Sequence, residues 1–274
     1  VIDDAAVTPA YVTGFTPDRE LPIIWKIAKG SLRNKLLVLL PLALALSALL
    51  PWAIIPILML GGAYLAFEGA EKVIEKLGGE KHGETLEDPI EDPAEFETER
   101  VSGAIRTDMI LSAEIMAIAL AQVEGATMAT RALALGLVGV LITAAVYGAV
   151  ALIVKMDDVG LHLARKPGRG AQAIGRMLLH AMPVVLTVLG SVGTVAMLWV
   201  GGGIILHGLE ELGVPQPAAL AHHVEHVLAA AGGPAGGVLG WLGYALASAL
   251  AGMVVGTVVA VAVHLVAKVM PAKG

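Results

Sequence analysis

The chain has 274 residues, of which 57% are apolar and 15% are charged, and its mean hydropathy is +0.79. A soluble domain is nearer half apolar and a quarter charged, so the composition excludes an ordinary soluble protein. Cysteine is absent, which excludes disulfides and thiol chemistry. The net charge is -6 and no stretch is densely basic, so we expect no nucleic-acid partner.

Long uncharged runs (with His counted as neutral) predict the class of protein. They cover residues 36–67, 132–154, 177–209 and 226–267. A helix needs about 20 mostly apolar residues to cross a bilayer. The runs do not alternate as the strands of a membrane barrel would. The sequence therefore predicts an all-α, polytopic membrane helix bundle.

The N-terminal segment 1–35 is predicted to be a lead-in that ends in a helix at the membrane interface. The chain starts at Val1 without Met, so we expect the true N-terminus to lie upstream. Thr16-Pro17 is typical of a helix start, with Thr as the N-cap. Residues 20–35 are amphipathic and basic and contain Trp25, which suits a helix lying in the interface.

The first uncharged run is too long for one span and is interrupted near its centre by Pro51-Trp52. We expect a hairpin of two helices, about 33–50 and 53–76. An acidic loop, 78–100, follows. Nine of the 24 acids lie between Glu80 and Glu99, which predicts a solvated linker.

Two further spans, about 104–124 and 131–155, complete a first membrane half, 36–155. Residues 156–176 are polar and basic, and we expect a cytoplasmic linker there.

The second membrane half is predicted to cover 177–274. Its first run, 177–209, resembles the first hairpin and is expected to break at Gly190-Ser191. Residues 213–235 contain a short helix between Pro and Gly breakers, and 236–267 form the last span.

Lys and Arg cluster in 19–35, 72–106, 155–176 and 268–273. The positive-inside rule then places both termini in the cytoplasm. An even number of spans is required, and six to eight fit the sequence.

An internal repeat is a further expectation. Residues 60–73 align with 199–212 at an offset of 139, and 148–155 align with 261–268 at an offset of 113. Duplication predicts two related halves with a site between them, as in many transporters. The alternative is a chance match between helices rich in Gly, Ala, Leu and Val.

Four strings carry a resemblance to a known family: DRELPIIWKIAKGSL (18–32), PWAIIPILMLGGAYLAFEGAEKV (51–73), SGAIRTDMILSAEIMAIAL (102–120) and VALIVKMDDVGLHLA (150–164). The chain resembles the YedI-type bacterial inner-membrane proteins, a family of unknown function. The resemblance implies a multi-pass protein of the bacterial inner membrane and implies no activity.

Glu114 is the only charged residue between Met109 and Val123. A charge at the centre of a membrane helix costs about 2.5–3.5 kcal/mol on insertion scales, so the carboxylate needs water, a partner or a proton. Asp108 and Ser112 lie on a neighbouring face of the same helix. The functional interpretation is a cation or proton site, and the alternative is a structural carboxylate that orients helices.

Glu68 is the other candidate carboxylate, and Lys72 lies at i+4, the favourable order for an ion pair. The repeat places His207 opposite Glu68. The sequence thus proposes a polar core of Glu114, Asp108, Glu68, Ser112 and His207, with the Glu68–Lys72 pair at the membrane edge as the alternative.

His222 and His226 are four residues apart, so both could bind one metal ion from a helix face, whereas Glu225 is expected to point elsewhere. The site would need a third ligand, and the alternative is an ordinary interfacial helix. No hydrolase motif occurs, and we expect neither enzymatic activity nor a cofactor.

Our leading hypothesis is a transporter, or an ion or proton pathway, in the lipid bilayer. Assembly into a homo-oligomer is compatible with this hypothesis. The alternatives are a structural or partner-binding membrane protein, and a metal-dependent intramembrane enzyme.

Overall fold

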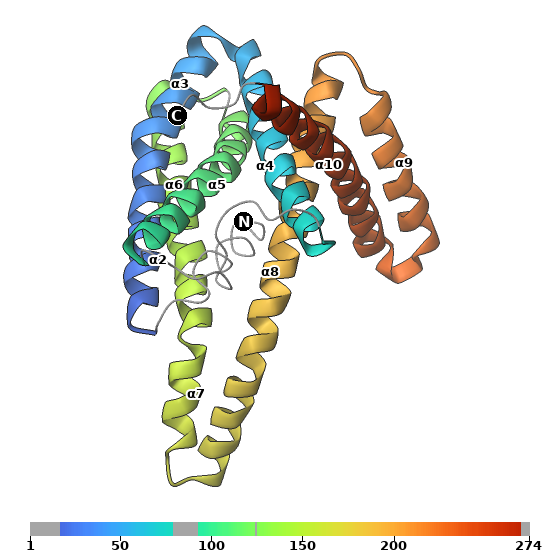
Figure 1. The fold of residues 1–274 in the computed structure, drawn as a ribbon. Helices are drawn as coiled ribbons and strands as arrows, with labels where there is room; N and C mark the ends of the chain where they lie inside the picture. The colour runs from blue at the N-terminus through green and yellow to red at the C-terminus, as the bar shows by residue number, and fades with distance from the viewer. Residues whose placement is uncertain (1–16, 79–92, 124, 270–274) are drawn as a thin grey trace. The chain divides into compact units, whose positions relative to one another are not determined.

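The structure is a computed structural model that describes residues 17–78, 93–123 and 125–269, and all secondary structure in these ranges is helical (Figure 1). The chain divides into two compact units. Of the described residues, the first unit contains 17–45, 93–123 and 125–193, and the second contains 46–78 and 194–269. Each unit takes segments from both of the membrane halves that the sequence predicts.

The first unit starts with a long helix made of α2 (Pro17–Asn34), the π-helix η1 (Lys35–Leu39) and α3 (Leu40–Leu49), of which residues 46–49 belong to the second unit. In η1 the Leu40 N–H donates to the Lys35 carbonyl, five residues back. Pro41 follows directly and has no N–H to donate, and a local π adjustment lets a membrane helix accommodate such a residue. The predicted interfacial helix 20–35 is therefore not a separate element, because it continues into the first span.

Helices α5 (Pro93–Gln122), α6 (Met128–Val154), α7 (Met156–Ala164) and the start of α8 (Arg169–Glu211) complete the first unit. Leu39, Met116, Leu120 and Leu135 form a buried apolar cluster between the first helix, α5 and α6. Because α5 begins at Pro93, residues 93–100 of the predicted acidic loop are helical, and residues 79–92 of that loop lie outside the described residues.

The second unit consists of η2 (Pro51–Ala53), α4 (Ile54–Lys76), the rest of α8, α9 (Gln216–Ala231), η3 (Gly233–Ala235) and α10 (Gly236–Val269). Glycines let α8 and α10 approach closely. A Cβ atom built on Gly202 would lie 2.7 Å from the Gly252 N and closer still to the Ser248 carbonyl oxygen. Trp199 of α8 and Trp241 of α10 meet edge to face, with ring centroids 5.4 Å apart.

Helix α8 runs without interruption for 43 residues, so the predicted break at Gly190-Ser191 is wrong. A helix in lipid has no water to replace its backbone hydrogen bonds, so glycine breaks it less readily than in a soluble protein. Pro183 is also accommodated inside α8.

Five helical stretches of the described residues are long and apolar enough to cross a membrane: Arg19–Leu49, Pro51–Lys76, Met128–Ala164, Arg169–Glu211 and Gly233–Leu265. The sequence predicts six to eight. The expected span 104–124 falls in the C-terminal part of α5, which Arg106, Asp108 and Glu114 make too charged to qualify by composition. The architecture is that of a polytopic helical membrane protein.

Candidate functional site

A buried ion pair lies in the first unit. The Lys35 Nζ atom donates to both carboxylate oxygens of Asp108, at 2.9 Å to Oδ1 and 2.8 Å to Oδ2. Only 3% of the Lys35 side chain and 5% of the Asp108 side chain are exposed. Both charges are thus withdrawn from solvent, and each depends on the other for compensation.

Three hydroxyl groups surround the pair. Tyr147 donates to Asp108 Oδ1 at 3.0 Å, and Ser112 Oγ lies 3.4 Å from Asp108 Oδ2. Lys35 also donates to the Ser31 hydroxyl. The carboxylate therefore accepts two hydrogen bonds from the ammonium and two from hydroxyls, which is the satisfaction that a buried charge requires.

Helix periodicity explains how the sequence builds this site. Ser31 and Lys35 are four residues apart on one helix, and so are Asp108 and Ser112 on α5, so each pair shares a face. Lys35 is the first residue of the π-helix, and π turns in proteins occur frequently at functional sites. Gly139 of α6 faces Lys35, since a Cβ atom there would lie 3.5 Å from the Lys35 Cβ.

The structure brings together two of the five residues predicted for the polar core, Asp108 and Ser112. Glu114 lies further along α5 and is half-buried, whereas Asp108 on the same helix is buried. Sequence reasoning missed Lys35, Tyr147 and Ser31. The one available signal was that Lys35 is the last charge before the uncharged run 36–67.

Glu68 and His207 belong to the second unit. Glu68 binds Lys72 at 2.8 Å, and their side chains are 18% and 33% exposed. This is the i,i+4 pair that the sequence offered as the alternative. His207 lies on an exposed face of α8.

The histidines proposed as metal ligands are both exposed on α9. His222 Nδ1 lies 3.0 Å from Glu225 Oε2, and the ring stacks on Tyr244 with centroids 5.0 Å apart. The expectation that Glu225 points elsewhere is therefore wrong. No group of three or more His, Asp or Glu side chains in the described ranges is arranged to hold a metal ion.

A second charged cluster lies near the start of α5. Glu97, which is buried, accepts hydrogen bonds from Lys26 and Arg19 of α2. The Lys26 hydrogen bond, followed by that from Arg19, holds the pKa of Glu97 below its usual value. Glu97 lies in the predicted acidic loop, yet it joins α5 to α2.

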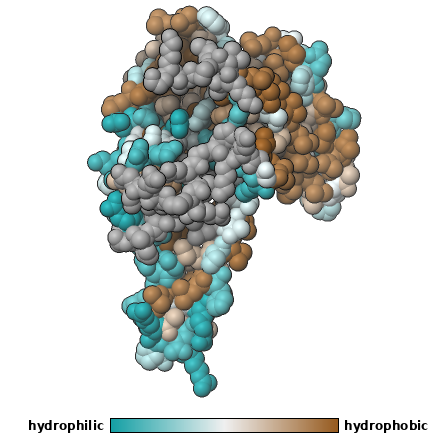
Figure 2. Space-filling view, viewed as in Figure 1, coloured by the Kyte–Doolittle hydropathy of each residue, from teal (hydrophilic) through white to brown (hydrophobic). Residues whose placement is uncertain are grey.

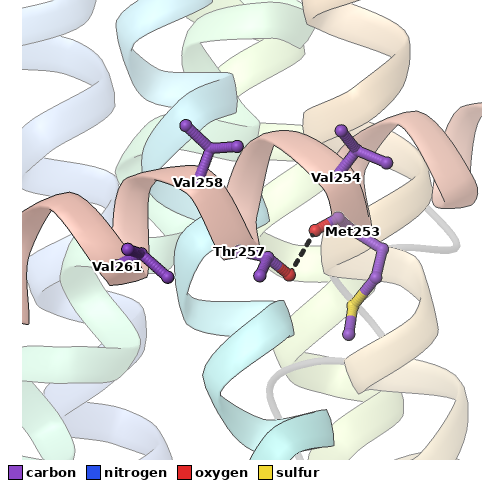
Figure 3. A pocket seen from close by; sticks show the side chains of 5 residues that line it. All are labelled: Met253, Val254, Thr257, Val258 and Val261. Atoms are coloured by element: carbon purple, nitrogen blue, oxygen red, sulfur yellow. Dashed lines mark hydrogen bonds between the residues drawn. The ribbon is translucent and has the colours of Figure 1, made fainter.

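Helix α10 carries an apolar groove of about 450 Å³ in the second unit, lined by Met253, Val254, Thr257, Val258 and Val261 (Figure 3). Its single hydroxyl is occupied, because Thr257 donates to the Met253 carbonyl at 2.7 Å. The groove therefore presents no polar group for chemistry.

The fold and the buried ion pair define a polytopic helical membrane protein with a polar site inside the bundle. The chain belongs to the family described as "Protein of unknown function (DUF808)", which matches residues 1–262. This agrees with the expectation of an uncharacterised family, although the description carries no YedI-type name. No curated protein and no solved structure matches the chain.

Proposed function

We propose that this protein translocates protons or cations across the bacterial inner membrane, with both termini in the cytoplasm and without enzymatic activity. The observation that carries the proposal is the buried Lys35–Asp108 pair with its shell of hydroxyl groups. Ionisable residues inside membrane segments are rare, costly and by default functional.

The cost of the pair argues for a use beyond stability. Replacing a buried ion pair by packed apolar residues is often neutral or stabilising, so stability alone does not require Lys35 and Asp108. Protonation of Asp108 would remove the counter-charge of Lys35. The buried ammonium would then have to lose a proton or move, which couples a proton to a rearrangement of the helices.

The setting of Lys35 favours such a rearrangement. The π-helix η1 begins at this residue and has i→i+5 hydrogen bonding, which is less regular than the α-helix on either side. A shift between π and α hydrogen bonding would rotate Lys35 relative to α3. The ammonium could thereby leave Asp108 while the rest of the helix keeps its packing.

A symmetric helix crossing in the second unit supports the internal repeat. A Cβ atom on Gly62 of α4 would lie 2.9 Å from the Gly201 carbonyl oxygen, and one on Gly201 of α8 would lie 2.6 Å from the Gly62 carbonyl oxygen. These two glycines are equivalent at the sequence offset of 139. Helices α4 and α8 therefore cross at a pair of residues that the sequence alignment already makes equivalent.

The flanking contacts follow the same relation. Gly208 faces Met59, and Gly69 faces Leu198, with a Cβ on Gly69 lying 3.0 Å from the Leu198 Cγ. At the offset of 139, Met59 is equivalent to Leu198 and Gly69 is equivalent to Gly208. The repeat relation therefore converts the Met59–Gly208 contact into the Leu198–Gly69 contact, and the reverse. Since α4 and α8 run antiparallel here, the relating two-fold axis is perpendicular to them, which is the arrangement of an inverted repeat in a transporter.

The test is proton flux in proteoliposomes under an imposed potassium diffusion potential, read with an internal pH dye. The decisive variant is the double substitution Lys35→Met with Asp108→Leu, which removes both charges and leaves none unpaired. We expect it to fold with a stability close to wild type and to lose the flux. The single variant Lys35→Met should be less stable by about 3–5 kcal/mol, because it leaves an uncompensated buried carboxylate.

The flux of Glu114→Gln is measured beside that of the double variant, because this substitution removes a half-buried carboxylate of the same helix and keeps both Lys35 and Asp108. Equal flux in the wild type and the double variant would refute a role of the pair in transport. Because the proposal includes cations, the same vesicles are also assayed for Na⁺ and K⁺ uptake. Absence of proton and of cation flux in the wild type, together with full stability of the double variant, would favour the alternative of a structural or partner-binding membrane protein.

A further inference from the structure

The connection between α7 and α8 is a basic hairpin in the first unit (Figure 1). Its cations are Arg165, Lys166, Arg169 and Arg176, and all four are exposed. From Val159 to Leu209 the chain contains no acidic residue. None of the four side chains makes an ion pair or hydrogen bond with the described part of the chain, so their charges face outward.

The hairpin is held closed by backbone contact. A Cβ atom on Gly175 of α8 would lie 2.6 Å from the carbonyl oxygen of Gly160 on α7, and one on Gly160 would lie 3.1 Å from the Gly175 carbonyl oxygen. Such close approach leaves no room for side chains between the two helices. The cations are therefore presented on a narrow, defined element rather than on a loose loop.

Apolar side chains are exposed among the cations. Val159, Leu161, Ile174 and Met177 are between 44% and 62% exposed. Figure 2 shows this mixture, with hydrophobic patches inside the mostly hydrophilic lower end of the hairpin. Exposed cations interleaved with exposed apolar residues are typical of elements that bind a charged lipid interface.

The length of α8 places these residues at a membrane surface. The uncharged run 177–209 would be about 50 Å long as a helix, whereas a bilayer with its headgroups is about 40–45 Å thick. The first cation, Arg176, follows this run directly. Arg169 lies about 10 Å further along the helix, a distance close to the Debye length of about 8 Å at physiological salt.

We propose that the tip of the α7–α8 hairpin is a docking surface for the anionic phospholipid headgroups of the adjacent leaflet. The four cations would bind phosphates, and the exposed apolar side chains would enter the boundary between headgroups and acyl chains. Clusters of at least four Lys or Arg residues next to a membrane helix bind anionic headgroups, and each of these residues changes the ratio of docked to free hairpin by about fivefold. The inference is independent of any transport activity.

Because the chain contains no cysteine, a single introduced cysteine can be labelled without a competing thiol in the chain. A single cysteine is introduced by Gly168→Cys at the hairpin tip, where a Cβ meets only Ala171 at an ordinary 3.9 Å. The full chain, labelled there with a fluorophore, is reconstituted in phosphatidylcholine vesicles with or without phosphatidylglycerol. Quenching by lipids with a spin label at the headgroup boundary reports the docked population.

We expect stronger quenching in the anionic vesicles and loss of this difference at high salt. Changing the four cations to Gln should reduce the ratio of docked to free hairpin by more than about a hundredfold. The matched control changes the three arginines to Lys, which keeps the charge and should behave as the starting protein. Equal quenching in both vesicle types, or undiminished docking of the Gln variant, would overturn the proposal.

Discussion

The contact between α8 and α10 supplies a paired substitution at two adjacent glycines. At Gly202 a Cβ atom would meet backbone atoms of Ser248 and Gly252, whereas at Gly203 the nearest atom is the Ser248 Oγ, at 3.9 Å. Both changes to Ala add one methyl group to the interior of the same helix. The difference between them therefore isolates the packing of the two helices from the intrinsic preference of the residue.

The expected magnitude follows from the distances. Backbone cannot rotate away, so Gly202→Ala must separate α8 from α10 by about 0.7 Å merely to bring the Gly252 N from 2.7 Å to an ordinary 3.4 Å. Overpacking of this kind costs about 1–3 kcal/mol. Gly203→Ala should change the stability by between zero and about 1 kcal/mol in the favourable direction, because Ala is the better helix former.

The assay is the midpoint of thermal unfolding of both variants in the same detergent at one scan rate, since membrane proteins commonly unfold irreversibly. The edge-to-face pair of Trp199 and Trp241 bridges these helices, and it contributes to the tryptophan fluorescence together with the exposed Trp25 and Trp52. We expect Gly202→Ala to melt several degrees below wild type and Gly203→Ala at or above it. Equal midpoints for the two variants would refute the close approach of α8 and α10.

Two further predictions concern other contacts. The pKa of Glu97 is lowered by Lys26 and Arg19, so the stability it contributes is present above its unfolded pKa, near 4.5, and is lost as the pH falls through the lower folded value. Since both cations are half-exposed, Glu97→Gln should lower the free energy of unfolding by about 1 kcal/mol at pH 7 and by nothing in acid. Melting temperatures measured across this pH range test the prediction, and the same pH profile in the wild type and the variant would contradict the ion pairs. Gly208→Ala should be tolerated better than Gly202→Ala, because the three atoms nearest to a Cβ at Gly208 all belong to the flexible side chain of Met59. A loss of stability as large as that of Gly202→Ala would show that Met59 cannot move.

Long apolar runs made the membrane class and several helix bounds predictable. The expected span 131–155 corresponds to α6, and the expected interruption at Pro51-Trp52 corresponds to η2, which separates α3 from α4. In lipid a helix must satisfy its own backbone, so hydropathy alone determines these elements. The same physics explains the error at Gly190-Ser191, where breakers typical of soluble proteins leave α8 intact.

The candidate site was only partly predictable, because it depends on contacts between distant segments. Lys35 and Asp108 are 73 residues apart, and no local pattern pairs them. Glu114 attracted attention because its sequence neighbours are apolar, whereas Asp108 is close to Arg106 along the chain. A charged residue whose sequence neighbours are all apolar is not thereby buried in the fold. Of these two carboxylates, it is Asp108 that faces the interior of its unit.

The π-helix at Lys35–Leu39 also has an evolutionary consequence. A π turn holds about one residue more than an α turn, so it is what remains when a single residue is inserted into an established helix. Relatives that lack the insertion should show a one-residue gap within this segment when they are aligned. In them the lysine would be turned by about 100° around the helix, and an acid at position 108 would have lost its counter-charge. The gap and the loss of that acid should therefore occur in the same sequences.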